Sequence, residues 1–144
     1  MKRILLLCSV MMMLLSAIAF AEKKIIDIDK LPKDVKEFIG YYFYGDEIYL
    51  AEKEKSGDYI VNLKSGIEIK FKWTGEWLYI NGNNNKITHN VLPKEVIKTI
   101  MSLYPQCAIL DTSINDNRYD IKLDNNMNLY IEKNGKLIGR KYEY

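Results

Sequence analysis

Few residues in this chain have the chemistry of a catalytic group. The 144-residue sequence contains one histidine, His89, and two cysteines, Cys8 and Cys107. A nucleophile needs a base beside it, and a zinc ion needs three or four Cys, His or acidic ligands. His89 lies in an asparagine-rich stretch, and Cys107 begins the apolar run Cys-Ala-Ile-Leu. We interpret His89 as a solvated loop residue and Cys107 as a small apolar core residue, and we predict no catalytic residue, metal or cofactor.

Other chemistries have weaker support. The segment from Asp111 to Asp120 spaces Asp and Asn side chains as a calcium loop does, but it lacks the central glycine and the closing glutamate. Its alternation favours a strand, a turn and a second strand. No glycine-rich phosphate loop is present. A hydrolase that uses His89 as a base remains one alternative, and a reactive or intermolecularly disulfide-bonded Cys107 is another.

Polar residues on predicted strands carry the stronger hypothesis. Alternation places Asn62, Glu68, Lys70 and Lys72 on the face opposite the apolar residues, and Tyr130 lies between Leu129 and Ile131 in the same way. Aromatic side chains among charges on an open sheet face are typical of protein contacts. The predicted partner-binding sheet face therefore consists of Asn62, Glu68, Lys70, Lys72 and Tyr130.

An internal repeat positions these residues. LPKDVKEFI begins at Leu31, and LPKEVIKTI begins 61 residues later at Leu92. After one residue is lost in a turn, the match continues at an offset of 60, where Tyr59 corresponds to Tyr119 and Gly75 to Gly135. Two matching halves in a short chain indicate a tandem duplication.

Each half predicts one helix followed by four strands. Apolar residues recur at helical spacing after Pro32 and Pro93, and turn pairs then recur every nine residues. The inward-facing strand residues are expected to include Trp73, and a polar loop over 81–90 joins the halves. We therefore predict an α+β fold of two tandem helix-plus-four-strand units, about 31–80 and 92–142, that form a mainly antiparallel sheet with the helices on one face.

The first 21 residues have the features of a signal peptide. Lys2 and Arg3 precede an apolar run, and Ala19-Phe20-Ala21 is a small-x-small cleavage signal. A membrane anchor and a lipidated Cys8 are the alternatives. Cleavage leaves 22–144 as a single domain and removes two of the 21 basic residues, so that 19 basic residues balance 19 acidic ones. The mature chain is therefore expected to be periplasmic or secreted, without nucleic-acid binding or stable membrane insertion.

These motifs resemble the PepSY-like secreted proteins, whose fold is similar to that of beta-lactamase inhibitor protein. The resemblance covers both halves and implies tandem helix-plus-four-strand units in one curved sheet, with no catalytic residues. The chain departs from the family pattern at Lys72, where an acidic residue is usual, and at Asn126 and Leu137, which replace Gly66 and Trp77 in the second half. The matching residues are Leu31, Pro32, Val35, Phe38, Ile39, Tyr59, Val61, Leu63, Gly66, Ile67, Ile69, Phe71, Gly75 and Trp77.

The expected function is that of an exported, non-enzymatic binding module. Its partner is an unknown protein or peptide, and inhibition of a secreted hydrolase is one form that this binding could take. The alternative is an envelope carrier or sensor for a small ligand, which requires an enclosed apolar pocket between the helices and the sheet.

Overall fold

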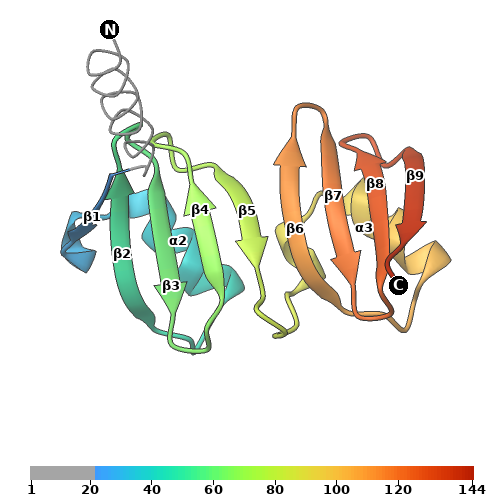
Figure 1. The fold of residues 1–144 in the computed structure, drawn as a ribbon, viewed down its shortest axis with the longest axis horizontal. Coiled ribbons are helices and arrows are strands. Elements are labelled where there is room, and N and C mark those ends of the chain that lie inside the picture. Colours follow the sequence, from blue (N-terminus) through green and yellow to red (C-terminus); the bar gives the residue numbers. More distant parts are fainter. Residues whose placement is uncertain (1–21) are drawn as a thin grey trace, which may run out of the picture.

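Nine antiparallel strands form one sheet within residues 22–144, which are the residues that the computed structural model describes. Both helices lie on the same face of this sheet (Figure 1). The predicted signal segment, residues 1–21, lies outside the described residues. The α+β class and the mainly antiparallel sheet are thus confirmed. The elements are β1 (Lys23–Ile26), η2 (Ile28–Lys30), α2 (Lys33–Tyr42), β2 (Ile48–Glu54), β3 (Tyr59–Leu63), β4 (Glu68–Phe71), β5 (Trp77–Asn81), η3 (His89–Val91), α3 (Lys94–Leu103), β6 (Ile109–Asn115), β7 (Arg118–Leu123), β8 (Met127–Glu132) and β9 (Leu137–Tyr142).

Four strands follow each helix along the chain, but β1 was not predicted. This strand pairs with β2 over four positions, from Lys23 opposite Glu54 to Ile26 opposite Ala51. Its two isoleucines suit an extended backbone because their branched side chains restrict χ1. The strand was missed because a run of four residues is too short to show a period of two.

The two helices bury matching stripes. Val35 and Ile39 are buried on α2, and Val96 and Ile100 are buried on α3. Each helix begins directly after a proline, where a missing N–H removes no helical hydrogen bond. The buried stripes pack against the apolar face of the sheet and make one continuous core.

One row of core residues crosses the sheet from β1 to β8. Register pairs connect each member to the next strand, so the core runs without interruption from one half to the other. The halves join where β5 pairs with β6 through Tyr79 opposite Ser113, Ile80 opposite Thr112 and Asn81 opposite Asp111. The row consists of Ile26, Ala51, Val61, Ile69, Ile80, Thr112, Ile121 and Leu129.

The asparagine-rich linker is built into the sheet junction. The amide nitrogen of Asn85 donates to the carbonyl oxygens of Ser65 (3.1 Å) and Gly82 (2.8 Å), and the backbone N–H of Gly82 donates to the Leu110 carbonyl at 2.8 Å. A side chain at Gly82 would begin 2.3 Å from the Asn85 carbonyl oxygen. The predicted polar loop is therefore a tight connection that fixes how the halves meet.

Trp73 lies outside the core, contrary to the prediction. β4 ends at Phe71, and the indole of Trp73 is exposed in the following turn. The backbone N–H of Trp73 donates to the Asp58 carboxylate at 3.2 Å, which holds this turn against the β2–β3 turn. The alternation of the strand was extended two residues too far, because the turn at Gly75 interrupts it earlier. No helix within residues 22–144 is long and apolar enough to cross a membrane.

Candidate functional site: the open sheet face

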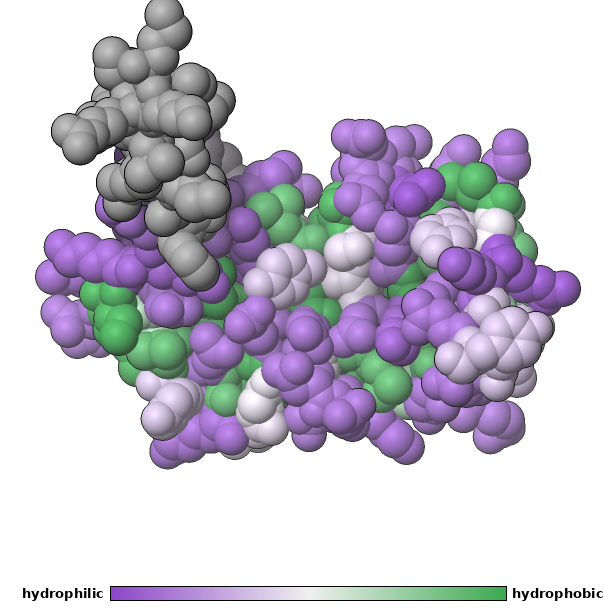
Figure 2. All heavy atoms as spheres, viewed as in Figure 1, coloured by the Kyte–Doolittle hydropathy of each residue, from purple (hydrophilic) through white to green (hydrophobic). Residues whose placement is uncertain are grey.

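The face of the sheet opposite the helices is open and mostly polar. We call this face the open face. Figure 2 shows it from the front: most of its residues are hydrophilic, and hydrophobic residues lie between them. Register pairs arrange its central side chains in two rows. The first row is Glu52, Ile60, Lys70, Tyr79, Ser113, Asp120 and Tyr130, and the second is Leu50, Asn62, Glu68, Asn81, Asp111, Lys122 and Asn128.

The structure brings together three of the five predicted contact residues. Asn62 and Glu68 are directly opposite each other on β3 and β4, and Lys70 is two residues along β4 from Glu68. Lys72 lies just beyond the end of β4, where its ammonium group contacts the carboxylate of Glu76 at 3.1 Å. Tyr130 shares a row with Lys70 but lies four strands away, which is roughly 19 Å at the usual strand spacing. The predicted set is therefore not one cluster.

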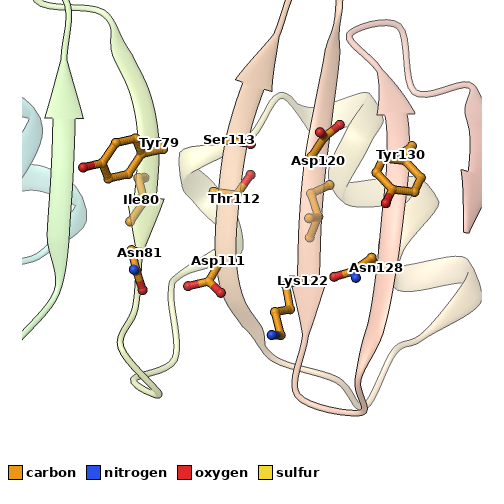
Figure 3. A pocket seen from close by; sticks show the side chains of 11 residues that line it. Tyr79, Ile80, Asn81, Asp111, Thr112, Ser113, Asp120, Lys122, Asn128 and Tyr130 are labelled. Carbon is orange, nitrogen blue, oxygen red and sulfur yellow. The ribbon is translucent and has the colours of Figure 1, made fainter. Parts of the chain in front are cut away.

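A hollow of about 320 Å³ lies on the open face where the two halves meet. Figure 3 shows side chains from β5, β6, β7 and β8 around it. Of the predicted contact set, only Tyr130 lines it. The sequence reasoning missed the others because the pairing of β5 with β6 is a tertiary contact that no local pattern reveals. The polar lining residues that belong to the two rows of the open face are Tyr79, Asn81, Asp111, Ser113, Asp120, Lys122, Asn128 and Tyr130.

Tyr79 is fixed at one side of this hollow. Its hydroxyl donates to the Glu68 carboxylate at 2.6 Å, and in Figure 3 its ring leans from β5 toward β4. Burial raises the pKa of Tyr79, and the hydrogen bond to Glu68 and the negative charges of Glu68, Glu54 and Glu52 raise it further. The ring therefore lies in a region of negative potential.

Tyr130 borders the other side of the hollow, where its ring lies against an arginine that is itself ion-paired. The guanidinium carbon of Arg118 lies 5.1 Å from the centre of the Tyr130 ring, within the range of a cation–π contact. The Arg118 Nε donates to the Asp120 carboxylate at 2.8 Å, and the amide of Asn115 donates to the same carboxylate at 2.5 Å. The charge of Arg118 is thus balanced before any partner arrives.

The second row contains the remaining charges of the hollow. The ammonium group of Lys122 contacts the Glu143 carboxylate at 3.2 Å. A hydrogen bond from Asn128, followed by the contacts with Lys122, lowers the pKa of Glu143. One carboxylate oxygen of Asp111 accepts the backbone N–H of Gly82 at 3.2 Å. Within residues 22–144, neither Asp111 nor Glu68 forms an ion pair.

Neither His89 nor Cys107, the two residues considered for catalysis, lines this hollow. His89 begins η3 and is partly buried, and its Nε2 atom has no hydrogen-bond partner within residues 22–144. The expectation of a solvated histidine is wrong for this atom, because η3 packs through Val91 onto the core. The Asp111–Asp120 segment is the β6–β7 hairpin, as its alternation predicted. The described part of the chain contains no group of three Cys, His or acidic residues placed to hold a metal ion.

A two-helix, antiparallel-sheet protein with one covered and one open face is the class that these features define. The family comparison is more specific. A family model described as "Putative beta-lactamase-inhibitor-like, PepSY-like" matches residues 18–73 and 57–139. The chain therefore belongs to the PepSY-like family, as the sequence motifs indicated.

Solved structures from Bacteroides share the fold. A "putative calcium-regulated periplasmic protein" of Bacteroides thetaiotaomicron is 22% identical over 83% of this chain and 96% of its own, with a TM-score of 0.76. A "putative periplasmic protein from DUF2874 family" of Bacteroides vulgatus is 22% identical over 83% and 97% of the two chains, with a TM-score of 0.77. Another protein of that species, of unknown function, is 24% identical over 83% and 99%, with a TM-score of 0.74. No curated protein matches the chain.

Proposed function

We propose that this protein is an exported, non-enzymatic binding module that holds another protein or peptide against its open face. The observation that carries this proposal is the asymmetry of the sheet: α2 and α3 cover one face, and no helix or strand of residues 22–144 covers the other. Tyrosines on the open face are held by Glu68 and by Arg118. Aromatic side chains that are ordered before binding lose little conformational entropy on contact, which suits them to an interface.

Export is part of the proposal. The predicted signal peptide over residues 1–21 supports it, and all three of the similar structures reported above are described as putative periplasmic proteins. We also infer that the two helix-plus-four-strand halves arose by duplication, since Gly75 and Gly135 occupy equivalent turns and each lies against the first turn of its own helix. The duplication would have made a sheet wide enough for a macromolecular partner.

A small ligand is the alternative partner. The carrier hypothesis required an enclosed apolar pocket between helices and sheet, whereas the hollow of about 320 Å³ lies on the open face, and charged residues are among those that line it. Its volume is at the lower end of the range for ligand sites. This placement favours an anchor for part of a larger partner. A thermal shift with a small envelope metabolite, unchanged when Asn62 and Lys70 are replaced, would favour the carrier instead.

The proposal is tested by affinity capture from an envelope extract. The wild-type protein is compared with a double variant of the open face, Lys72→Glu with Tyr130→Ala. A matched variant of the helix side, Lys36→Glu with Tyr41→Ala, carries the same kinds of substitution on an exposed surface. We expect a partner that the wild type and the helix-side variant retain and the open-face variant loses. Capture of the same proteins by all three would contradict binding through this face.

A further inference from the structure

Building on the proposed function, we infer that the partner places a basic side chain, arginine or lysine, in the hollow between Tyr79 and Tyr130. The hollow lies at the centre of the sheet, where β5 and β6 join the halves. A central pocket is where an interface usually concentrates its binding energy. The two observations that select the occupant are the shape of the hollow and its charge.

The shape follows from the residue over the junction. Ser113 is the small member of a row whose neighbours include Tyr79 and Asp120, so the space above it is not filled by its own side chain. Tyr79 leans toward β4, away from Ser113 (Figure 3). Its hydrogen bond to Glu68 holds it there. The resulting space of about 320 Å³ is sufficient for one long side chain with its water, but it is small for a ligand buried whole.

The charge follows from which groups already have partners. Arg118 is paired with Asp120, and Lys122 is paired with Glu143. Asp111 lies on the same face of β6 as Ser113, two residues away, and within residues 22–144 it forms no ion pair. Lys122 lies opposite Asp111 on β7 but is paired with Glu143. A guanidinium or ammonium group above Ser113 would therefore meet a carboxylate that has no ion-pair partner within residues 22–144, whereas an acidic side chain would be repelled.

The aromatic borders favour the same occupant. The Tyr130 ring makes a cation–π contact with Arg118, so one aromatic ring of the lining already lies against positive charge. The long apolar stem of an arginine or lysine can lie over the ring edges while its head reaches Asp111. A purely apolar anchor would instead displace water from Asp111 and leave its charge without a cation.

The test uses short random peptides displayed on phage and selected on the immobilised purified protein. The same selection is run on Asp111→Asn, which removes one charge but keeps an oxygen to accept the Gly82 N–H. A matched variant, Asp116→Asn, removes the same charge in the β6–β7 turn, where the residue has a φ of 51° that asparagine adopts readily. A third variant, Ser113→Trp, fills the hollow. Circular dichroism and thermal unfolding establish that each variant is folded.

We expect arginine and lysine to be enriched in peptides selected on the wild type and on Asp116→Asn. The affinity of such a peptide should fall about tenfold in Asp111→Asn, as for removal of one partner of a close interfacial charge pair. Ser113→Trp should weaken it at least as much. If Ser113→Trp does not fold, the comparison of Asp111→Asn with Asp116→Asn decides by itself.

The outcomes separate this inference from the proposed function. Peptides that bind without a preference for basic residues, or that bind Asp111→Asn and Asp116→Asn equally, overturn the inference and leave binding by the open face intact. If no peptide is selected on any form of the protein, the result counts against both.

Discussion

The two halves differ most at the last strand of each, although they follow the same plan. Trp77 begins β5 and Leu137 occupies the equivalent position in β9. Trp77 is 7% exposed, and its ring centre lies 5.9 Å from that of Tyr119 in the other half, whereas Leu137 is only partly buried. β5 pairs with β6 on the side away from its own half, whereas β9 is the edge strand of the sheet within residues 22–144. A large aromatic side chain is therefore buried at the end of β5, where residues of the other half pack against it, and the edge strand β9 offers no such contacts within residues 22–144.

Truncating these two residues should give the largest difference between the halves. We expect Trp77→Ala to lower the free energy of unfolding by about 3–5 kcal/mol, because it leaves a cavity at the junction of the halves. Leu137→Ala should lower it by about 1–2 kcal/mol, because the side chain is already partly solvated. Urea unfolding followed by fluorescence and circular dichroism measures both. Equal losses would show that β5 and β9 contribute alike and that the junction is not a shared core.

The turns that lead into these strands contact the helices differently. Gly75 and Gly135 both have positive φ, 93° and 92°, and both lie against the first turn of their own helix. A Cβ atom at Gly75 would be 3.1 Å from the Asp34 Cβ atom, which belongs to a side chain. A Cβ atom at Gly135 would be 2.7 Å from the Glu95 carbonyl oxygen, which belongs to the helix backbone. The second turn is therefore the tighter one.

Alanine at these glycines should be tolerated unequally. Positive φ costs an alanine about 1–2 kcal/mol at either position. At Gly135 the helix backbone must also move, so we expect a total loss of about 3 kcal/mol for Gly135→Ala, in the range of other overpacked sites. Gly75→Ala should lose only the conformational cost. A larger loss at Gly75 in the same unfolding assay would reverse the assignment of the tighter turn.

The two helices also contact the rest of their own halves differently, one through an aromatic side chain and the other through a hydroxyl group. Phe38 on α2 packs 5.4 Å from the Phe71 ring, measured between ring centres. The equivalent residue on α3 is Thr99, whose hydroxyl donates to the Gly135 carbonyl at 2.5 Å. The first half is thus held to its sheet by aromatic packing and the second by a hydrogen bond to the tight turn.

Replacing both residues by valine separates these contributions. Phe38→Val should lower the free energy of unfolding by about 2 kcal/mol through lost packing. Thr99→Val keeps the shape but removes the hydrogen bond, for an expected loss of about 1 kcal/mol. The loss from Thr99→Val should largely disappear in a background that already carries Gly135→Ala, because the turn has then moved. Full additivity in this double-mutant cycle would contradict the contact.

Much of this fold could be predicted from the sequence because its signals are local. The prolines marked the helix starts, turn pairs marked the hairpins, and alternation placed Tyr130 on the open face. The alternation of apolar and polar residues gave a wrong prediction at Trp73, because the chain turns there and no longer follows the two-residue period of a strand. The hollow could not be predicted, because it depends on the register between β5 and β6, which places Tyr79 beside Ser113. The backbone is closely packed beside this junction at Gly82, and no repeated motif in the sequence marks the register.

The open face itself is asymmetric. Lys70 and Tyr79 face each other across β4 and β5, and the equivalent pair in the second half is Tyr130 with Gly139. A Cβ atom at Gly139 would lie 3.8 Å from the Tyr130 ring, so this ring lies beside the glycine at the sheet edge. The hydrogen bond to Glu68 has no counterpart at Gly139, which has no side chain. Any response to pH that arises from this hydrogen bond therefore belongs to the first half alone.

The smallest expected effect is a loss of stability at alkaline pH through Tyr79. Its pKa in the folded protein is raised above the ordinary value of 10.0, first by burial and then by Glu68. The protonated hydroxyl therefore stabilises the fold below pH 10, and this contribution is lost as the pH rises beyond that value. Tyr79→Phe cannot ionise, so its unfolding free energy should fall less between about pH 9 and about pH 11 than that of the wild type. Tyr119, whose pKa burial also raises, is present in both proteins and cancels in the comparison. Identical losses in the two proteins would mean that the bond between Tyr79 and Glu68 does not hold the wall of the hollow in solution.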